Sequence, residues 1–156
     1  MKNEYGPQIN TDAHGFKYGK ITEKVIGVFF DVYNELGYGF LESVYQKSLV
    51  LALNSIGLKA CARIDIPVSF RGHSVGNFEA DVLVEDCLLL ELKSARTIDP
   101  SHMAQLLNYL RATKIEVGLL LNFGLKPEFR RLLFDNPRKS IRANPCLSVA
   151  DLLQTD

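Results

Sequence analysis

The segment that decides the fold is residues 78–94, with the sequence FEADVLVEDCLLLELKS. Apolar residues occupy every second position along residues 78–84 and again along residues 88–92, and Glu85-Asp86 lies between the two runs. A period of two is typical of β-strands, because successive side chains point to opposite faces of a sheet. The segment therefore predicts two neighbouring antiparallel strands joined by a short turn.

Acidic and basic side chains share one face of the second strand. Period two places Glu91 beside Lys93, on the face opposite to the leucines at positions 88, 90 and 92. Asp81 lies on the first strand, on the face opposite to Ala80 and Val82. The strand pair is thus expected to have an apolar face and a face with ionisable groups.

The register of the pair determines whether Asp81 joins the other two. Paired residues of a hairpin share a face, and a slip of one residue reverses the faces. Asp81 lies opposite Glu91 only if the connection has an odd number of residues, such as Glu85-Asp86-Cys87, or if a bulge restores the face. A two-residue connection would place Asp81 on the other face.

Two converging carboxylates with a nearby amine suit a metal-dependent hydrolase. Mg²⁺ prefers oxygen ligands and is bound by one or two carboxylates together with waters and substrate phosphate. Such an ion polarises a phosphodiester and lowers the pKa of bound water. Lys93 would orient that water or stabilise developing charge. The alternative is a cross-strand salt bridge on a solvated face, which would contribute about 0.2–1 kcal/mol.

The remaining chain predicts an α/β fold. Helical apolar stripes run along residues 21–36 and 41–56, and residues 63–70 alternate like a half-buried strand. Asp99-Pro100 marks the start of a third helix, and the apolar run 117–121 indicates a strand buried on both faces. Residues 127–134 fit either a helix or a strand. This order favours a mixed β-sheet with helices packed on it.

Two helical positions could contribute to a site. Glu42 would be an additional metal or water ligand, or would simply stabilise the helix dipole in the first turn of its helix, one turn before Tyr45. Gln105 shares a helix face with Tyr109 and would hold a phosphate or the attacking water, although an exposed glutamine is common on helices. His102 is predicted to be a surface or capping residue.

Bulk composition excludes several classes of protein. The chain has 156 residues, 47% of them hydrophobic, which fits one globular domain. It contains no apolar run of about 18–20 residues and no secretory apolar segment, so we expect no membrane association and a cytoplasmic location. The three cysteines and three histidines lack zinc-ligand spacing, so reduced thiols are expected.

Charge is balanced overall but uneven along the chain. The formal net charge is zero, so the bulk field does not indicate nucleic-acid binding. A basic excess in residues 126–142 would face phosphates or form an ordinary solvated surface. Its members are Lys126, Arg130, Arg131, Arg138, Lys139 and Arg142. We expect a loosely ordered N-terminal arm (1–20), a folded domain (21–135) and a C-terminal extension (136–156).

Five blocks of this sequence resemble, in order, those of the GxxExxY family, small bacterial and archaeal proteins of the PD-(D/E)XK nuclease superfamily. The blocks are GFLESVY (39–45), ADVLVE (80–85), LELKS (90–94), AQLLNYL (104–110) and VGLLLNFG (117–124). The resemblance implies a restriction-endonuclease-like fold, a mixed sheet with an αβββαβ core and flanking helices. Ala80 stands where the superfamily name has a proline.

The resemblance also implies roles for individual residues. Asp81 and Glu91 would be metal ligands, joined by the backbone carbonyl of Leu92, and Lys93 would position the water or stabilise the transition state. Glu42 and Gln105 would complete the site from the flanking helices.

The first functional hypothesis is a Mg²⁺- or Mn²⁺-dependent nuclease that hydrolyses phosphodiester bonds of DNA, with RNA as the second choice of substrate. The alternative is a catalytically weak or inactive nucleic-acid-binding or regulatory module with the same fold. A third hypothesis is an interaction protein whose acidic site is vestigial. The composition permits a homodimer.

Overall fold

The computed structural model describes residues 18–135 and consists of three helices and five strands. In chain order these are α1 (Gly19–Leu36), α2 (Glu42–Ser55), β1 (Ala60–Phe70), β2 (His73–Val84), β3 (Leu88–Lys93), α3 (Pro100–Ala112), β4 (Val117–Phe123) and β5 (Pro127–Leu133). Helix α1 begins at Gly19, two residues before the apolar stripe. Most of the expected N-terminal arm and all of the expected C-terminal extension lie outside the described residues.

The five strands form one mixed sheet, as the sequence predicts. Their spatial order is the chain order, and every neighbouring pair is antiparallel except β3 and β4, which are parallel. Helix α3 makes the crossover that a parallel connection requires. The run from α2 to β4 gives the expected αβββαβ core, and the ambiguous segment 127–134 is the strand β5.

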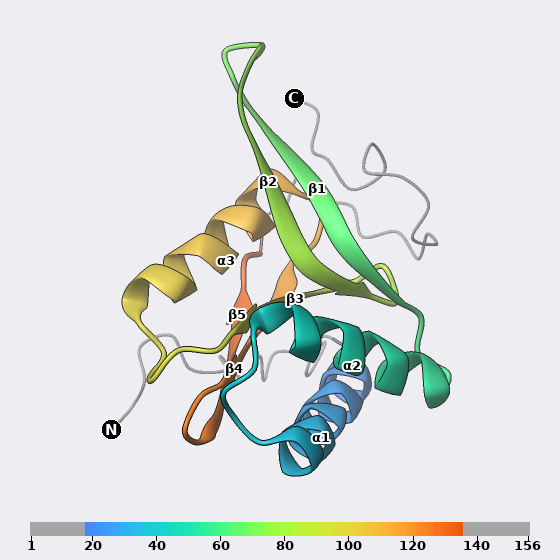
Figure 1. Ribbon diagram of the computed structural model, residues 1–156. Coiled ribbons are helices and arrows are strands. Elements are labelled where there is room, and N and C mark those ends of the chain that lie inside the picture. The colour runs from blue at the N-terminus through green and yellow to red at the C-terminus, as the bar shows by residue number, and fades with distance from the viewer. Residues whose placement is uncertain (1–17, 136–156) are drawn as a thin grey trace.

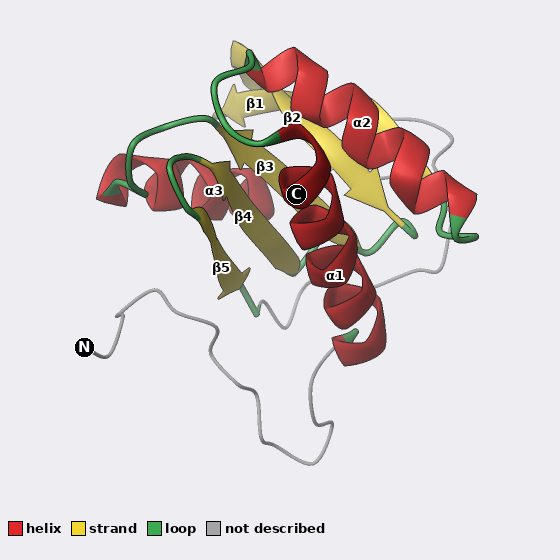
Figure 2. Ribbon diagram, turned by 60° about the horizontal axis from the view of Figure 1, so that its bottom comes forward, coloured by secondary structure: helices red, strands yellow, loops and turns green. Residues whose placement is uncertain are grey.

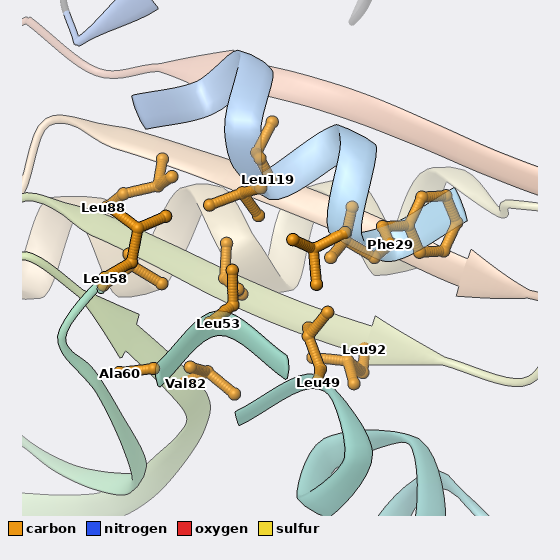
Figure 3. Close-up of a cluster of buried hydrophobic side chains, with 14 of the residues drawn as sticks. Phe29, Leu49, Leu53, Leu58, Ala60, Val82, Leu88, Leu92 and Leu119 are labelled. Atoms are coloured by element: carbon orange, nitrogen blue, oxygen red, sulfur yellow. The ribbon is translucent and has the colours of Figure 1, made fainter. Parts of the chain in front are cut away.

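Helices cover both faces of the sheet. Figures 1 and 2 show α1 and α2 on one face and α3 on the other. The α1/α2 side holds the larger apolar cluster, in which Phe29, Leu49 and Leu53 meet strand residues such as Leu92 (Figure 3). Strand β4 is buried along its whole length, as expected for a strand covered on both faces. None of the described helices is long and apolar enough to cross a membrane.

The connection between β2 and β3 has the odd length that the site hypothesis requires. Val84 pairs with Leu88, which leaves the three residues 85–87 between them. Glu85 and Asp86 both adopt left-handed conformations, with φ of 50° and 57°. The N–H of residue 87 donates to the Val84 carbonyl at 3.1 Å and closes the turn. The predicted register is therefore confirmed.

The apolar alternation along β2 is interrupted, contrary to the simple sequence pattern. Val82 belongs to the cluster under α1 and α2, whereas Ala80 belongs to the cluster under α3. Opposite this point on β1, Arg63 has φ of 59°, far from strand geometry. Such a local irregularity increases twist and re-aims side chains. Asp81 thus lies where the β1–β2 hairpin turns away from the main sheet.

The end of β4 fixes the segment that follows β3. Asn122 is fully buried, and its side chain accepts a hydrogen bond from the Ala95 N–H and donates one to the Ala95 carbonyl, both at 2.9 Å. A Cβ atom on Gly124 would collide with the same carbonyl oxygen. The Tyr33 hydroxyl donates to the Gly124 carbonyl at 2.8 Å. These contacts hold the backbone two residues beyond Lys93.

We expect Gly124→Ala to destabilise the protein, because the added methyl group meets backbone rather than a movable side chain. Overpacking of this kind costs about 1–3 kcal/mol. Urea unfolding would measure the loss, with Gly27→Ala as the matched control. Gly27 is exposed in α1 with nothing near its missing Cβ, so alanine there should gain about 0.5–1 kcal/mol. Equal stability of the two variants would contradict the close approach of Gly124 to the Ala95 carbonyl oxygen.

Candidate metal centre

Asp81 and Glu91 lie together where β2 and β3 meet. The β2–β3 pairing ends at Val82 and Leu90, and Asp81 and Glu91 are the next residues of the two strands in the same register. The Leu92 N–H donates to Asp81 Oδ2 at 2.7 Å. The main chain of β3 therefore holds the Asp81 carboxylate beside that of Glu91. Glu91 is only 4% exposed.

Burial and mutual repulsion make the two carboxylates hard to ionise together. Burial, followed by the charge of Asp81, raises the pKa of Glu91 to about 8, and Lys93 opposes this shift. Burial also raises the pKa of Asp81, whereas the hydrogen bond from Leu92 lowers it and the charge of Glu42 raises it. A protonated Glu91 is placed to donate a hydrogen bond to Asp81. Within the described residues Glu91 Oε2 is buried without a hydrogen-bond partner.

Lys93 stands next to the carboxylates and is held from α3. Its Nζ lies 3.8 Å from Glu91 Oε1 and donates to Gln105 Oε1 at 2.9 Å. The Gln105 amide in turn donates to the Tyr109 hydroxyl at 2.8 Å. Because its two ends have different partners, the Gln105 side chain has a defined orientation. The predicted common face of Gln105 and Tyr109 is confirmed, and it points at the lysine.

Helix α2 contacts the site through a residue that the sequence analysis did not select. The buried amide of Gln46 donates to the backbone carbonyl of Asp81 at 2.8 Å. Gln46 lies one turn after Glu42, on the same side of α2. The sequence signal that could have identified Gln46 is a polar residue within the apolar stripe of α2. Glu42 itself is exposed, and its charge acts on both Asp81 and Glu91.

Tyr45 fixes the turn in front of α2 and is fully buried. Its hydroxyl donates to the Gly37 carbonyl at 2.7 Å and accepts from the Phe40 N–H at 3.2 Å. Its ring stacks on Phe123 at the end of β4, with centroids 4.1 Å apart. Tyr45 therefore sets where α2 begins and where Glu42 projects.

The start of α3 is fixed by a reciprocal cap. Asp99 accepts from the Ser101 N–H at 2.7 Å, and His102 Nδ1 accepts from the Asp99 N–H at 3.1 Å. His102 is a capping residue, as predicted. The cap anchors the helix one turn before Gln105.

The arrangement fits a hard divalent cation. The described part of the chain has no group of three or more His, Cys, Asp or Glu side chains placed to hold a metal ion. The adjacent carboxylates of Asp81 and Glu91 are the candidate oxygen donors. Mg²⁺ and Mn²⁺ sites of this kind complete their coordination with water and substrate oxygens. The unpartnered Glu91 Oε2 is a buried acceptor that a cation would satisfy.

The expected basic stretch divides into two parts. Arg138, Lys139 and Arg142 lie outside the described residues. On β5, Arg131 is only 3% exposed and Arg130 lies 3.9 Å from Glu128. Strand β5 therefore does not present these two arginines as an open basic surface. Lys126, just before β5, is exposed.

A family model of the PD-(D/E)XK nuclease superfamily matches residues 19–132, most of the chain. The chain belongs to this superfamily. The match spans α1 to β5 and agrees with the restriction-endonuclease-like arrangement of the sheet and helices. Membership supports a nuclease-like function in general, with nucleic acid as substrate and the divalent metal ions that such nucleases use. No curated protein and no solved structure matches the chain.

The raised pKa of Glu91 predicts how the metal-free protein responds to pH. A pKa raised to about 8 in the folded state, from 4.5, gives a stabilising contribution that is complete below pH 4.5 and is lost as pH rises through 8. In Glu91→Gln the side chain is an amide that does not ionise, so stability is not lost in this way as pH rises. In EDTA, urea unfolding should therefore show the variant gaining stability relative to wild type as pH rises from 4.5 through 8, by roughly 1.4 kcal/mol for each unit by which the folded-state pKa exceeds 4.5.

Glu23→Gln, at an exposed position of α1, is the control and should follow wild type at every pH. A constant difference between wild type and Glu91→Gln across the range would contradict the burial of an ionisable Glu91.

Proposed function

We propose that this protein is a Mg²⁺- or Mn²⁺-dependent nuclease that hydrolyses phosphodiester bonds of DNA, with RNA as the second choice, and that it belongs to the GxxExxY group of the superfamily. The observation that carries the proposal is the Asp81–Glu91 carboxylate pair with Lys93 at its side. Superfamily membership supports the same class of reaction.

In this proposal Asp81, Glu91 and the Leu92 backbone carbonyl hold the ion, with Glu42 adding negative charge from the first turn of α2. A divalent ion bound there supplies Lewis-acid stabilisation of the phosphate and a water of lowered pKa. The hydrogen bonds from Leu92 and Gln46 to Asp81 keep the first ligand in place. Positioning of this kind preserves the geometry that the reaction needs.

Lys93 is the proposed catalytic residue that carries positive charge. Its Nζ lies near Glu91 on one side and is held by Gln105 on the other, so its position is defined before substrate arrives. A preorganised cation beside the scissile phosphate stabilises charge that develops in the transition state. Gln105 would orient the attacking water or the lysine. A homodimer would supply two such sites for the two strands of a duplex.

The second candidate is a nucleic-acid-binding or regulatory module that lacks efficient turnover. The observation that favours it is the exposure of Glu42 at the margin, which leaves two carboxylates at the centre of the described site. Salt-dependent binding of nucleic acid without metal-dependent cleavage would identify this function.

The test of the proposed function is cleavage of single- and double-stranded DNA and RNA with Mg²⁺ or Mn²⁺. We expect Lys93→Ala to lower kcat by about 10²–10³-fold, since an electrostatic contact to the transition state is lost. Lys24→Ala, an exposed lysine on α1, is the control and should cleave like wild type. The fold is checked by urea unfolding of each variant. Undiminished cleavage by a folded Lys93→Ala protein would reject the assigned role.

A further inference from the structure

The β1–β2 hairpin extends beyond the rest of the sheet (Figure 1). It presents large apolar side chains to solvent. Phe70 and Val75 are both 60% exposed, and Phe78 is 50% exposed. Phe70 lies under the guanidinium of Arg71, 5.0 Å from its ring centroid. Phe78 differs from Phe70 and Val75 because it contacts Tyr109 of α3, the helix whose Gln105 holds Lys93.

The ring of Phe78 is supported on two sides. Its centroid lies 6.1 Å from that of Tyr109, with an interplanar angle of 45°. A Cβ atom on Gly76 would lie 3.3 Å from Phe78 Cε2, so the ring covers the backbone of its own strand there. Phe78 pairs with Ile66, which belongs to the α3-side cluster. The ring is therefore held in place while half of it stays in water.

This ring adjoins the candidate site along two routes. Phe78 precedes Asp81 by three residues on β2, which corresponds to about 10 Å along a strand. Through space, Tyr109 contacts Phe78 with its ring and accepts from Gln105 with its hydroxyl, and Gln105 holds Lys93. A molecule resting on Phe78 would thus lie next to the carboxylates.

A fixed, half-exposed aromatic ring beside a phosphodiester-cleaving site suits a nucleobase. Base–aromatic stacking contributes roughly 5- to 150-fold in affinity per base and tolerates any sequence, because every base has a π-face. Bases within a continuous duplex have both faces covered by their neighbours. Stacking on Phe78 therefore selects for bases that are unpaired.

We propose that Phe78 is a specificity-determining residue that stacks an unpaired base next to the scissile phosphate, so that the site acts on single strands or frayed ends in preference to continuous duplex. The inference rests on the proposed function and names its substrate class. The shared chemistry is an unpaired nucleic-acid strand, and parallel DNA and RNA substrates distinguish its source.

The test measures binding in a Lys93→Ala background with Mg²⁺, so that substrate is not consumed. Fluorescence anisotropy of labelled single strands and of the matching duplex is compared for Phe78→Ala, Phe78→Tyr and Phe70→Ala. We expect Phe78→Ala to weaken single-strand binding by about fivefold or more and duplex binding much less. Phe78→Tyr should retain affinity, because the ring is kept. Phe70→Ala removes a ring that is at least as exposed as Phe78, and it should also retain affinity.

Substrates with one abasic position at a time locate the stacked base. Removal of that base should weaken binding to the parent protein and leave the already weakened Phe78→Ala protein unchanged. Here the parent protein is the Lys93→Ala variant, which keeps Phe78. A merely structural role for Phe78 would not give this position-specific pattern.

Equal weakening by Phe70→Ala and Phe78→Ala, or equal weakening toward single strand and duplex, would overturn the inference. Failure of the proposed function has a different signature. If the protein that keeps Lys93 does not cleave any substrate, but single-strand binding still depends on Phe78, the nuclease proposal is rejected and the stacking role is kept. Cleavage that is indifferent to Phe78 on every substrate would reject stacking and keep the nuclease.

Discussion

A hydrogen bond from the Leu92 N–H to the Asp81 carboxylate joins the architecture of the sheet to its candidate chemistry. It forms only if β2 and β3 pair with Asp81 opposite Glu91, which depends on the three-residue connection 85–87. Two consecutive residues of that connection adopt left-handed conformations without a glycine. Local strain of this kind persists where the surrounding structure requires it. A connection one residue shorter would separate the two carboxylates onto opposite faces.

The same register creates an electrostatic conflict that a cation would resolve. Two carboxylates share a largely buried position. Among residues 18–135 the ammonium group that lies beside them is that of Lys93, which Gln105 also holds. Without a further positive charge the pair favours keeping a proton, as the raised pKa of Glu91 shows. Buried charges that are costly for folding are common at functional sites, where local rules of stability are broken for chemistry. The carboxylate pair is therefore costly for folding unless a positive charge, such as the proposed cation, compensates it.

The sequence predicted the features that follow from hydrophobic periodicity and from the odd length of the β2–β3 connection. The order of elements, the shared face of Glu91 and Lys93, the odd connection and the capping role of His102 all follow from local patterns. Features that depend on long-range contacts were not visible in this way. The shift of Ala80 to the α3 side depends on the twisted pairing with β1, opposite Arg63.

The hydrogen bonds that hold the site in place were also not predictable from the sequence, because each joins residues distant in the chain. Gln46 reaches the backbone of Asp81, 35 residues away, and Asn122 clamps Ala95 across 27 residues. Short patterns indicate neither partner. The segment 127–134 carried a pattern compatible with two structures, and its pairing with β4 decided for a strand.

The most direct test of the central claim is X-ray diffraction from crystals soaked in Mn²⁺, recorded for its anomalous signal. We expect an anomalous peak between the carboxylates of Asp81 and Glu91, absent from crystals of Asp81→Asn. A Mn²⁺ ion bound elsewhere, or occupancy that survives the Asp81→Asn substitution, would contradict the assignment of these carboxylates as the metal ligands.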